Sequence, residues 1–233
     1  MISTLHLLPV SLGSAPLEQW LPAGARQQAS ILKTYIAENA KTARAYLKQT
    51  GTESAIQDIT IHTLGAKTPA ADIRRWLTET SGDIGLVSEA GCPAVADPGA
   101  RVVLMAHQLG IEVVPWVGPS SILLGLMASG LDGQRFTFHG YVPIAPAERG
   151  KQLKTWEQLS SRHNQTQLFI ETPYRNMAMF ATLIEALNPA TKLCVARALT
   201  TTDEWIRTDT IAGWKRRPQP DLDKFPTLFL FLA

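Results

Sequence analysis

Residues 85–130 read GLVSEAGCPAVADPGARVVLMAHQLGIEVVPWVGPSSILLGLMASG. Two strand-like runs in this stretch, Gly85–Val87 and Ile111–Pro115, each lead into a turn rich in Gly, Pro and Ser that opens a helix. Turns after neighbouring parallel strands gather at one edge of an open α/β sheet, where such sheets bind small ligands. Glycine lets the backbone approach a ligand, and proline fixes the shape of the loop. The stretch therefore predicts an α/β fold with a pocket at a sheet edge.

Length and composition set broad bounds. The chain has 233 residues, 45% of them hydrophobic, and a net charge of +2, which fits a globular protein with a sizeable core. The first residues, Met1–Leu12, lack the pattern of a signal peptide, and no apolar run approaches the roughly 18 residues of a membrane helix. The two cysteines and five histidines show no metal-ligand spacing. We expect a cytoplasmic protein without a membrane segment or a metal.

Through the first half, apolar runs of strand length alternate with segments of helix length. This alternation predicts a parallel sheet with helices on both faces. The expected strands are Leu5–Val10, Lys33–Ala37, Ile59–Thr63, Gly85–Val87 and Ile111–Val114, and the expected helices are Ala40–Gln49, Ala70–Thr80 and Ala100–Leu109.

The second half changes character, because its last strands have little helix between them, which indicates an antiparallel portion. The expected strands are Phe136–His139, Gln167–Ile170, Lys192–Ala196, Asp203–Arg207 and Thr227–Leu232, and the expected helices are an exposed one at Glu148–Arg162 and another at Arg175–Leu187. Trp214–Phe225 is polar and proline-rich and is expected to be an exposed loop. The fold class is thus two α/β lobes, residues 1–116 with a mostly parallel sheet and residues 117–233 with a mixed sheet.

Three turns are candidates for one binding site. The first, Pro9–Ser14, has a single glycine where the dinucleotide motif G-x-G-x-x-G has three, and it could be only a tight turn. In the second, Ser88–Gly99, the carboxylate of Asp97 is placed to cap the following helix. The third, Gly118–Ser121, precedes the apolar helix Ile122–Met127 and suits an anion, although helix capping alone would explain it. Their clustering at one edge would be stronger evidence than any single turn.

Several side chains have both a chemical and a structural interpretation. Glu38 and Glu171 each follow a strand, where a carboxylate can act as a general base or can serve as a cap or ion-pair partner. Cys92 has no His or Lys nearby in sequence, which favours a pocket-lining role over a nucleophilic one. Trp214 and Tyr174 could stack on RNA bases or pack in the core.

Basic side chains gather in two places in the second half. They form either solvated faces or contacts to RNA phosphates, which contribute salt-sensitive affinity. The two groups are Arg149, Lys151, Lys154 and Arg162, and Lys215, Arg216 and Arg217.

The sequence resembles the tetrapyrrole methylase superfamily of S-adenosylmethionine-dependent methyltransferases, in particular its ribosomal RNA small subunit methyltransferase I branch. That branch carries a Ser-Asp-Ala-Gly-Thr-Pro…Ser-Asp-Pro-Gly loop, which Ser88–Pro93 and Ala96–Gly99 match, and a Val-Pro-Gly-Pro-Ser-Ala turn, which Trp116–Ser121 matches. Its later motifs resemble residues 138–143, 170–175 and 196–201. The likeness follows the chain in order from end to end.

The resemblance implies two α/β lobes with S-adenosylmethionine in a cleft between them, a homodimer, and ribosomal RNA or the small ribosomal subunit as partner. It implies cofactor contacts from both lobes. Carried over position by position, the contacts are Pro9, Gly91, Cys92, Val95, Ala96, Ser120, Ser121, Thr172, Leu199, Pro226 and Thr227.

Three functions remain open at the sequence level. The first is methyl transfer to an oxygen of ribosomal RNA, most simply a ribose 2′-hydroxyl, with Glu38 and then Glu171 as candidate bases. The second is methylation of a tetrapyrrole or another small molecule. The third is a protein that binds the cofactor without transferring its methyl group. The third interpretation is motivated by departures from the branch pattern at Asn39, Glu89, Cys92 and Ala198.

Overall fold

The computed structural model describes residues 3–233, which form two compact units, one ending at Ser120 and the other beginning at Ser121. The division expected from the sequence lies between residues 116 and 117. Each unit has its own five-stranded sheet and its own hydrophobic core. No helix within residues 3–233 combines the length and the apolar character needed to cross a bilayer.

The sheet of the first unit is entirely parallel, as predicted, with the strand order β3-β2-β4-β1-β5. The chain leaves β1 toward β2 and leaves β4 toward β5, so the loops after these two neighbouring strands depart in opposite directions. This arrangement makes the carboxyl edge at β1 and β4 a topological switch point, the usual place for a ligand. The strands are β1 (Thr4–Leu7), β2 (Thr34–Ala37), β3 (Thr60–Thr63), β4 (Ile84–Val87) and β5 (Glu112–Pro115).

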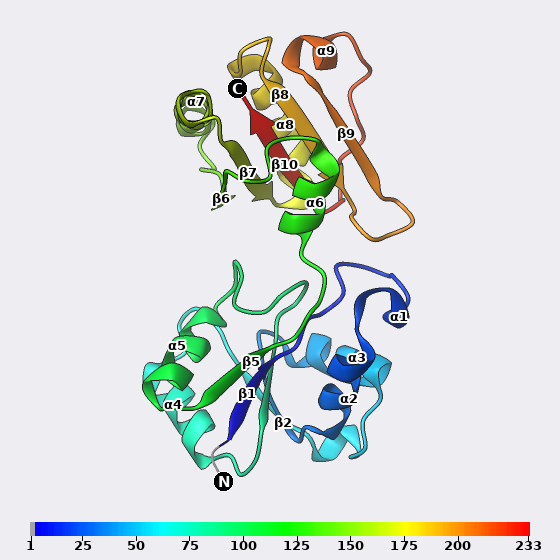
Figure 1. The fold of residues 1–233 in the computed structure, drawn as a ribbon, viewed down its shortest axis with the longest axis vertical. Coiled ribbons are helices and arrows are strands. Elements are labelled where there is room, and N and C mark those ends of the chain that lie inside the picture. Colours follow the sequence, from blue (N-terminus) through cyan, green and yellow to red (C-terminus); the bar gives the residue numbers. More distant parts are fainter. Residues whose placement is uncertain (1–2) are drawn as a thin grey trace. The chain divides into compact units, whose positions relative to one another are not determined.

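Helices cover both faces of this sheet (Figure 1). One face packs against α1 (Leu17–Trp20), α2 (Ala23–Ile31) and α3 (Ala40–Thr50), and the other against α4 (Ala70–Glu79) and α5 (Ala100–Gln108). The sequence did not predict α1 and α2. The inward face of α2 consists of Ala25 and Ala29, which are too small to give a clear apolar period.

The predicted helix after β2 illustrates how local sequence sets element ends. The Asn39 side chain accepts the Lys41 N–H at 2.8 Å and caps α3. The helix ends at Gly51, whose φ of 77° is a left-handed conformation that favours glycine.

The sheet of the second unit has the order β6-β7-β10-β8-β9, with β6 parallel to β7 and the other pairs antiparallel. The mixed sheet was predicted, although β9 begins two residues later than expected. Its strands are β6 (Phe136–Tyr141), β7 (Thr166–Glu171), β8 (Lys192–Arg197), β9 (Trp205–Thr210) and β10 (Thr227–Leu232).

Period-two alternation along β10 separates the two faces of this sheet. Phe229 and Phe231 join a core with α7 (Pro146–His163), α8 (Asn176–Ala186) and α9 (Ile211–Lys215). Leu228 instead meets α6 (Ser121–Ser129), where its side chain would overlap any Cβ at position 125. Gly125 therefore permits α6 to lie directly on the sheet.

Two expectations for the second unit were wrong. Trp214–Phe225 is not an exposed loop throughout, because α9 extends to Lys215 and Leu222 is fully buried. Trp214 is buried, and its indole N–H donates to the Leu193 carbonyl at 2.9 Å, so it cannot stack on a base. The helix expected to be exposed at Glu148–Arg162 also has an inner face, on which Arg149 is 7% exposed.

Candidate functional site

The loops that follow β1 and β4 are joined by a two-residue bridge. The Val10 N–H donates to the Gly91 carbonyl at 2.9 Å, and the Gly91 N–H donates to the Val10 carbonyl at 3.0 Å. Gly91 has φ +75°, and a Cβ there would lie 3.3 Å from the Leu12 Cδ2 atom. Both the positive φ and the tight contact favour glycine at the point where two loops leave the switch point in opposite directions.

The turn after β5 packs against the same two loops. A Cβ on Gly118 would overlap the ring of Pro9, so these residues are in close contact only because position 118 is glycine. The Cys92 thiol points at the Pro119 carbonyl, with 3.4 Å between sulfur and oxygen. Burial raises the pKa of Cys92, so the thiol is a protonated donor and not a ready nucleophile. The structure thus brings the three candidate turns of the first unit together.

Asp97 organises the loop from Ser88 to Gly99. Its carboxylate accepts the Ala94 N–H at 2.9 Å and the Gly99 N–H at 2.6 Å. Asp97 thus accepts a backbone N–H at the start of α5, as predicted, although the N-cap residue of that helix is Gly99 and not Asp97. Burial raises the pKa of Asp97, while its two backbone hydrogen bonds oppose that rise. The carboxylate acts on the loop before the helix.

The middle of this loop is held in an uncommon conformation. Ala94 and Ala96 have φ values of 67° and 62°, and the Val95 side chain between them is 49% exposed. Within residues 3–233, the backbone N–H groups of Cys92, Val95 and Ala96 donate no hydrogen bond. The loop therefore offers a set of backbone donors that a ligand with carboxylate or ring-nitrogen acceptors could use.

Glu38 lies just beyond β2, at the same carboxyl edge. Its Oε1 atom accepts the Glu89 N–H at 3.4 Å. Burial, followed by the nearby Asp97 carboxylate, raises the pKa of Glu38. A raised pKa makes a carboxylate a stronger base than it is in water, so Glu38 has the character that a proton acceptor needs.

Strand register gathers the candidates of the second unit at one edge of its sheet. Thr227, at the start of β10, is opposite Glu171 on one side and Arg197 on the other. Thr172, Pro226 and Leu199 adjoin these positions, and the Ala198 N–H donates to the Pro226 carbonyl at 2.8 Å. Apart from Ser121, the four residues of this unit that were predicted to contact the cofactor therefore lie at a single edge of the sheet.

Ser121 reaches that edge through α6. The Thr208 hydroxyl donates to the Ser129 carbonyl at the far end of the helix, and Gly125 packs against Leu228, which lies one residue inside the edge. The helix thus runs outward from Ser129 through Gly125, and one further turn carries Ser121 to the edge of the sheet.

Leu199 has the same local backbone pattern as Val95. The residues on either side of it, Ala198 and Thr200, have φ values of 51° and 69°. The Thr200 N–H donates to the Glu204 carboxylate at 2.7 Å, which fixes the turn. Unlike Val95, the Leu199 side chain is buried.

Arg197 joins the two loops of this edge, a role that sequence reasoning missed. Its guanidinium lies 4.5 Å from the centroid of the Phe225 ring and donates to the Asp221 carbonyl at 2.6 Å. A second nitrogen donates to the Asp203 carbonyl at 3.2 Å. The only hint in the sequence was the position of Arg197 in a motif of the resemblance, because its partners are backbone atoms distant in sequence.

The two candidate carboxylates have different environments. Glu171 is completely buried as a side chain, and its Oε1 atom accepts the Thr172 N–H at 2.6 Å and the Arg175 Nε–H at 2.9 Å. Its Oε2 atom has no hydrogen bond partner among the residues described. Glu171 is thus an ion-pair partner of Arg175, whereas Glu38 lies in a partly open position. Within residues 3–233 there is no group of three or more His, Cys, Asp or Glu side chains that could hold a metal ion.

The protein thus consists of two α/β units, and in each unit the candidate loops gather at one edge of the sheet. A family model described as tetrapyrrole (corrin/porphyrin) methylases matches residues 23–213. The chain belongs to this family.

Relatives and a solved structure agree with this assignment. The chain is 31% identical to ribosomal RNA small subunit methyltransferase I of Xylella fastidiosa over 213 residues, covering 90% of the chain and 73% of that relative. It is 38% identical to the protein of the same name from Mesorhizobium japonicum over 128 residues, 55% of the chain and 42% of the relative. For the Pseudomonas aeruginosa protein of that name, the chain spans 48% of the length. The crystal structure of the methyltransferase CobJ superposes with a TM-score of 0.63 at 15% identity, covering 99% of the chain and 94% of that structure, and it supports the fold.

Proposed function

We propose that the protein transfers a methyl group from S-adenosylmethionine to ribosomal RNA of the small subunit, at a ribose 2′-hydroxyl. The observation that carries the proposal is the bridge between Val10 and Gly91, which holds a loop with free backbone donors at the switch point of a methylase-family sheet. The acceptor class is suggested by relatives named for ribosomal RNA of the small subunit.

The residues present fit this cofactor. Backbone N–H groups of Cys92, Val95 and Ala96 suit the carboxylate and ring nitrogens of S-adenosylmethionine, and the glycines at 91 and 118 let the three loops pack closely against one another. When bound, the cofactor supplies a methyl group that its sulfonium makes electrophilic. The proposal assigns contacts in the first unit to Pro9, Gly91, Cys92, Val95, Ala96 and Ser120, and in the second unit to Ser121, Thr172, Leu199, Pro226 and Thr227.

The protein's main task in this reaction is to align the acceptor oxygen and keep water away, which can supply up to about 7–11 kcal/mol of barrier reduction in ideal cases. A ribose hydroxyl is a weak nucleophile, so its proton must leave as the oxygen attacks. Glu38 is the proposed acceptor of that proton, because its pKa is raised by burial and by Asp97. Glu171 is proposed to act through Arg175, which it holds by two hydrogen bonds.

The same proposal includes a cytoplasmic location and a homodimer. Its direct test is to incubate the protein with methyl-labelled S-adenosylmethionine and small ribosomal subunits from a strain that lacks it. Label should appear in the RNA, and nuclease digestion should return it as a 2′-O-methylated nucleoside. Label on a tetrapyrrole or in the small-molecule fraction, with none in RNA, would refute the acceptor. Absence of calorimetric binding of the cofactor would refute the proposal as a whole.

A further inference from the structure

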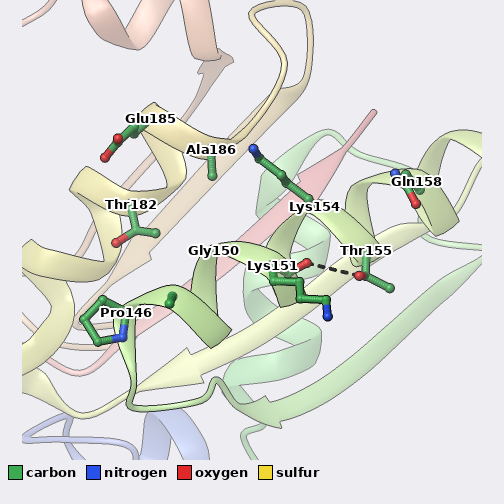
Figure 2. A pocket seen from close by; sticks show the side chains of 10 residues that line it. Pro146, Gly150, Lys151, Lys154, Thr155, Gln158, Thr182, Glu185 and Ala186 are labelled. Carbon is green, nitrogen blue, oxygen red and sulfur yellow. Dashed lines mark hydrogen bonds between the residues drawn. The ribbon is translucent and has the colours of Figure 1, made fainter.

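A groove on the second unit lies outside the edge described above. It is a hollow of about 650 Å³ between α7 and α8, lined by residues between 146 and 158 of α7 and between 182 and 186 of α8 (Figure 2). This volume is within the range of roughly 300–1,000 Å³ typical of ligand sites. Six of the ten residues that line this α7–α8 groove have polar or charged side chains, among them Lys151, Lys154 and Glu185.

The polar side chains of the α7–α8 groove fall into two sets. The Thr155 hydroxyl donates to the Lys151 carbonyl at 3.0 Å (Figure 2). The Thr182 hydroxyl donates to the Ala178 carbonyl at 2.8 Å, so both hydroxyls are already engaged within their own helices. Lys151, Lys154 and Gln158 have no side-chain hydrogen bond or ion pair with any residue in the part of the chain that the structure describes. The groove thus presents two uncompensated ammonium groups.

Three basic residues and one glutamine form a line along α7, and the last of them, Arg162, lies beyond the lining of the groove. Lys151, Lys154, Gln158 and Arg162 are spaced by three, four and four residues, so they lie along one side of the helix, and all four are exposed. At a rise of about 1.5 Å per residue, the line extends over roughly 16 Å, which is long enough to follow several consecutive phosphates of a strand.

Acidic neighbours do not neutralise this line. Glu157 has its carboxylate turned toward the loop before β8, where it accepts the Asn188 N–H at 2.7 Å and the Thr191 hydroxyl. Only Glu185 contributes a carboxylate to the lining of the groove, opposite two lysines. The groove therefore keeps a net positive charge.

We propose that the α7–α8 groove binds the phosphate backbone of the RNA substrate, with Lys151 and Lys154 as the principal contacts. This inference rests on the proposed function, because it takes RNA as the acceptor. The occupant is an RNA strand, since unpaired lysines in a line complement a row of phosphates. The groove would position the substrate, and the chemistry would remain at the edges that hold the cofactor.

The test uses the whole chain and small-subunit ribosomal RNA, with binding followed by fluorescence anisotropy between about 50 and 200 mM salt. The variant is Lys151→Gln with Lys154→Gln. Its matched control is Lys33→Gln with Lys48→Gln, which removes the same charge from exposed positions at the amino-terminal edge of the first unit's sheet. A third variant, Glu185→Gln, removes the carboxylate from the groove lining and so makes the groove more positive.

Two lost phosphate contacts should reduce the slope of log K against log salt by about 1.4, since each contact to a single strand contributes about 0.7. At about 0.1 M salt, the same contributions correspond to roughly a 25-fold loss of affinity. The control should bind RNA like the unmodified protein, Glu185→Gln should bind more tightly, and S-adenosylmethionine binding should be the same in all four proteins.

Two results would overturn the inference, and they differ in what else they affect. If the groove variant and its control bind RNA with the same affinity and salt slope, the groove is not an RNA surface, and the proposed function stands. If the unmodified protein does not bind small-subunit RNA, the acceptor proposed for the reaction fails as well.

Discussion

Gly91→Ala is the substitution that most directly tests the bridge between the loops after β1 and β4. Gly91 has φ +75°, where an alanine costs about 1–2 kcal/mol of backbone strain. The added Cβ would lie 3.3 Å from the Leu12 Cδ2 atom and 3.5 Å from the Pro119 oxygen, contacts that a small shift of the leucine can relieve. We therefore expect a loss of about 1–2 kcal/mol in folding stability, which lowers Tm by roughly 2–8 °C for a chain of this size.

The effect on cofactor binding should be larger than strain alone explains. If the loop relaxes away from φ +75°, the two hydrogen bonds with Val10 weaken, each contributing about 0.5–1.5 kcal/mol. A loss of about 1–3 kcal/mol corresponds to roughly a 5- to 150-fold weaker Kd for S-adenosylmethionine by calorimetry. The control is Gly110→Ala, because Gly110 has φ +68° and open space around its Cβ position.

Both variants should lose similar stability by differential scanning calorimetry, but only Gly91→Ala should lose cofactor affinity. Equal cofactor affinities in the two variants would refute the conclusion that the bridge shapes the cofactor loop. Unchanged stability in both would refute the strain estimate.

Other predictions concern single residues. Glu38→Gln should slow methyl transfer by about 10²–10⁴-fold with cofactor Kd unchanged, and should abolish the rise of the rate as pH increases through the raised pKa of Glu38, measured as a pH–rate profile. Ala96→Gly should raise Tm, because it relieves a left-handed alanine, and should weaken cofactor binding in calorimetry, because the loop loses its preset shape. Arg197→Met should cost about 1.5–3 kcal/mol or more in urea unfolding, because it removes charged hydrogen bonds to two carbonyls. Trp214→Phe should cost about 1–3 kcal/mol, because it leaves the Leu193 carbonyl without its indole donor, and should leave RNA affinity in anisotropy unchanged.

Raising the pH is expected to increase the methyl-transfer rate through Glu38 but to decrease folding stability through the same residue. Because burial raises the pKa of its carboxyl in the folded state, the folded protein holds that proton more tightly than the unfolded chain does. Stability therefore falls as pH rises from the unfolded pKa through the raised folded pKa. The Glu38→Gln variant should lack this fall in stability. Although it transfers methyl groups more slowly, it should therefore be no less stable than the unmodified protein at neutral pH.

The sequence predicted those parts of the fold that depend on local patterns. Strands β4 and β5 lie within one residue of their predicted bounds, whereas β1 ends at Leu7 and not at Val10, because Pro9 and Val10 belong to the loop that follows it. The three candidate turns do meet. Helix α2 was missed because its buried face is made of alanines. Trp214 was placed in an exposed loop because the surrounding charges and prolines outweighed a single apolar residue whose partner, the Leu193 carbonyl, is 21 positions away in the chain.

The environment of the candidate site was less accessible to sequence. Glu38 follows β2 and Glu171 is the last residue of β7, and nothing in the local sequence distinguishes the two carboxylates. Only the fold shows that Glu171 is buried against Arg175, whereas Glu38 is partly open and near Asp97. Arg197 could not be assigned a role, because it acts on main-chain oxygens of two distant loops.

Backbone strain links the candidate loops of the two units. Six non-glycine residues in the described part of the chain have positive φ, and four of them, Ala94, Ala96, Ala198 and Thr200, flank Val95 or Leu199. Alanine and threonine gain nothing from this conformation, which costs each about 1–2 kcal/mol. Such strain persists only where surrounding contacts impose it, here from Asp97 in one loop and from Glu204 in the other. Because these two loops were also selected by their sequence motifs, independently of φ, the coincidence favours a ligand-shaping role over a merely connecting one.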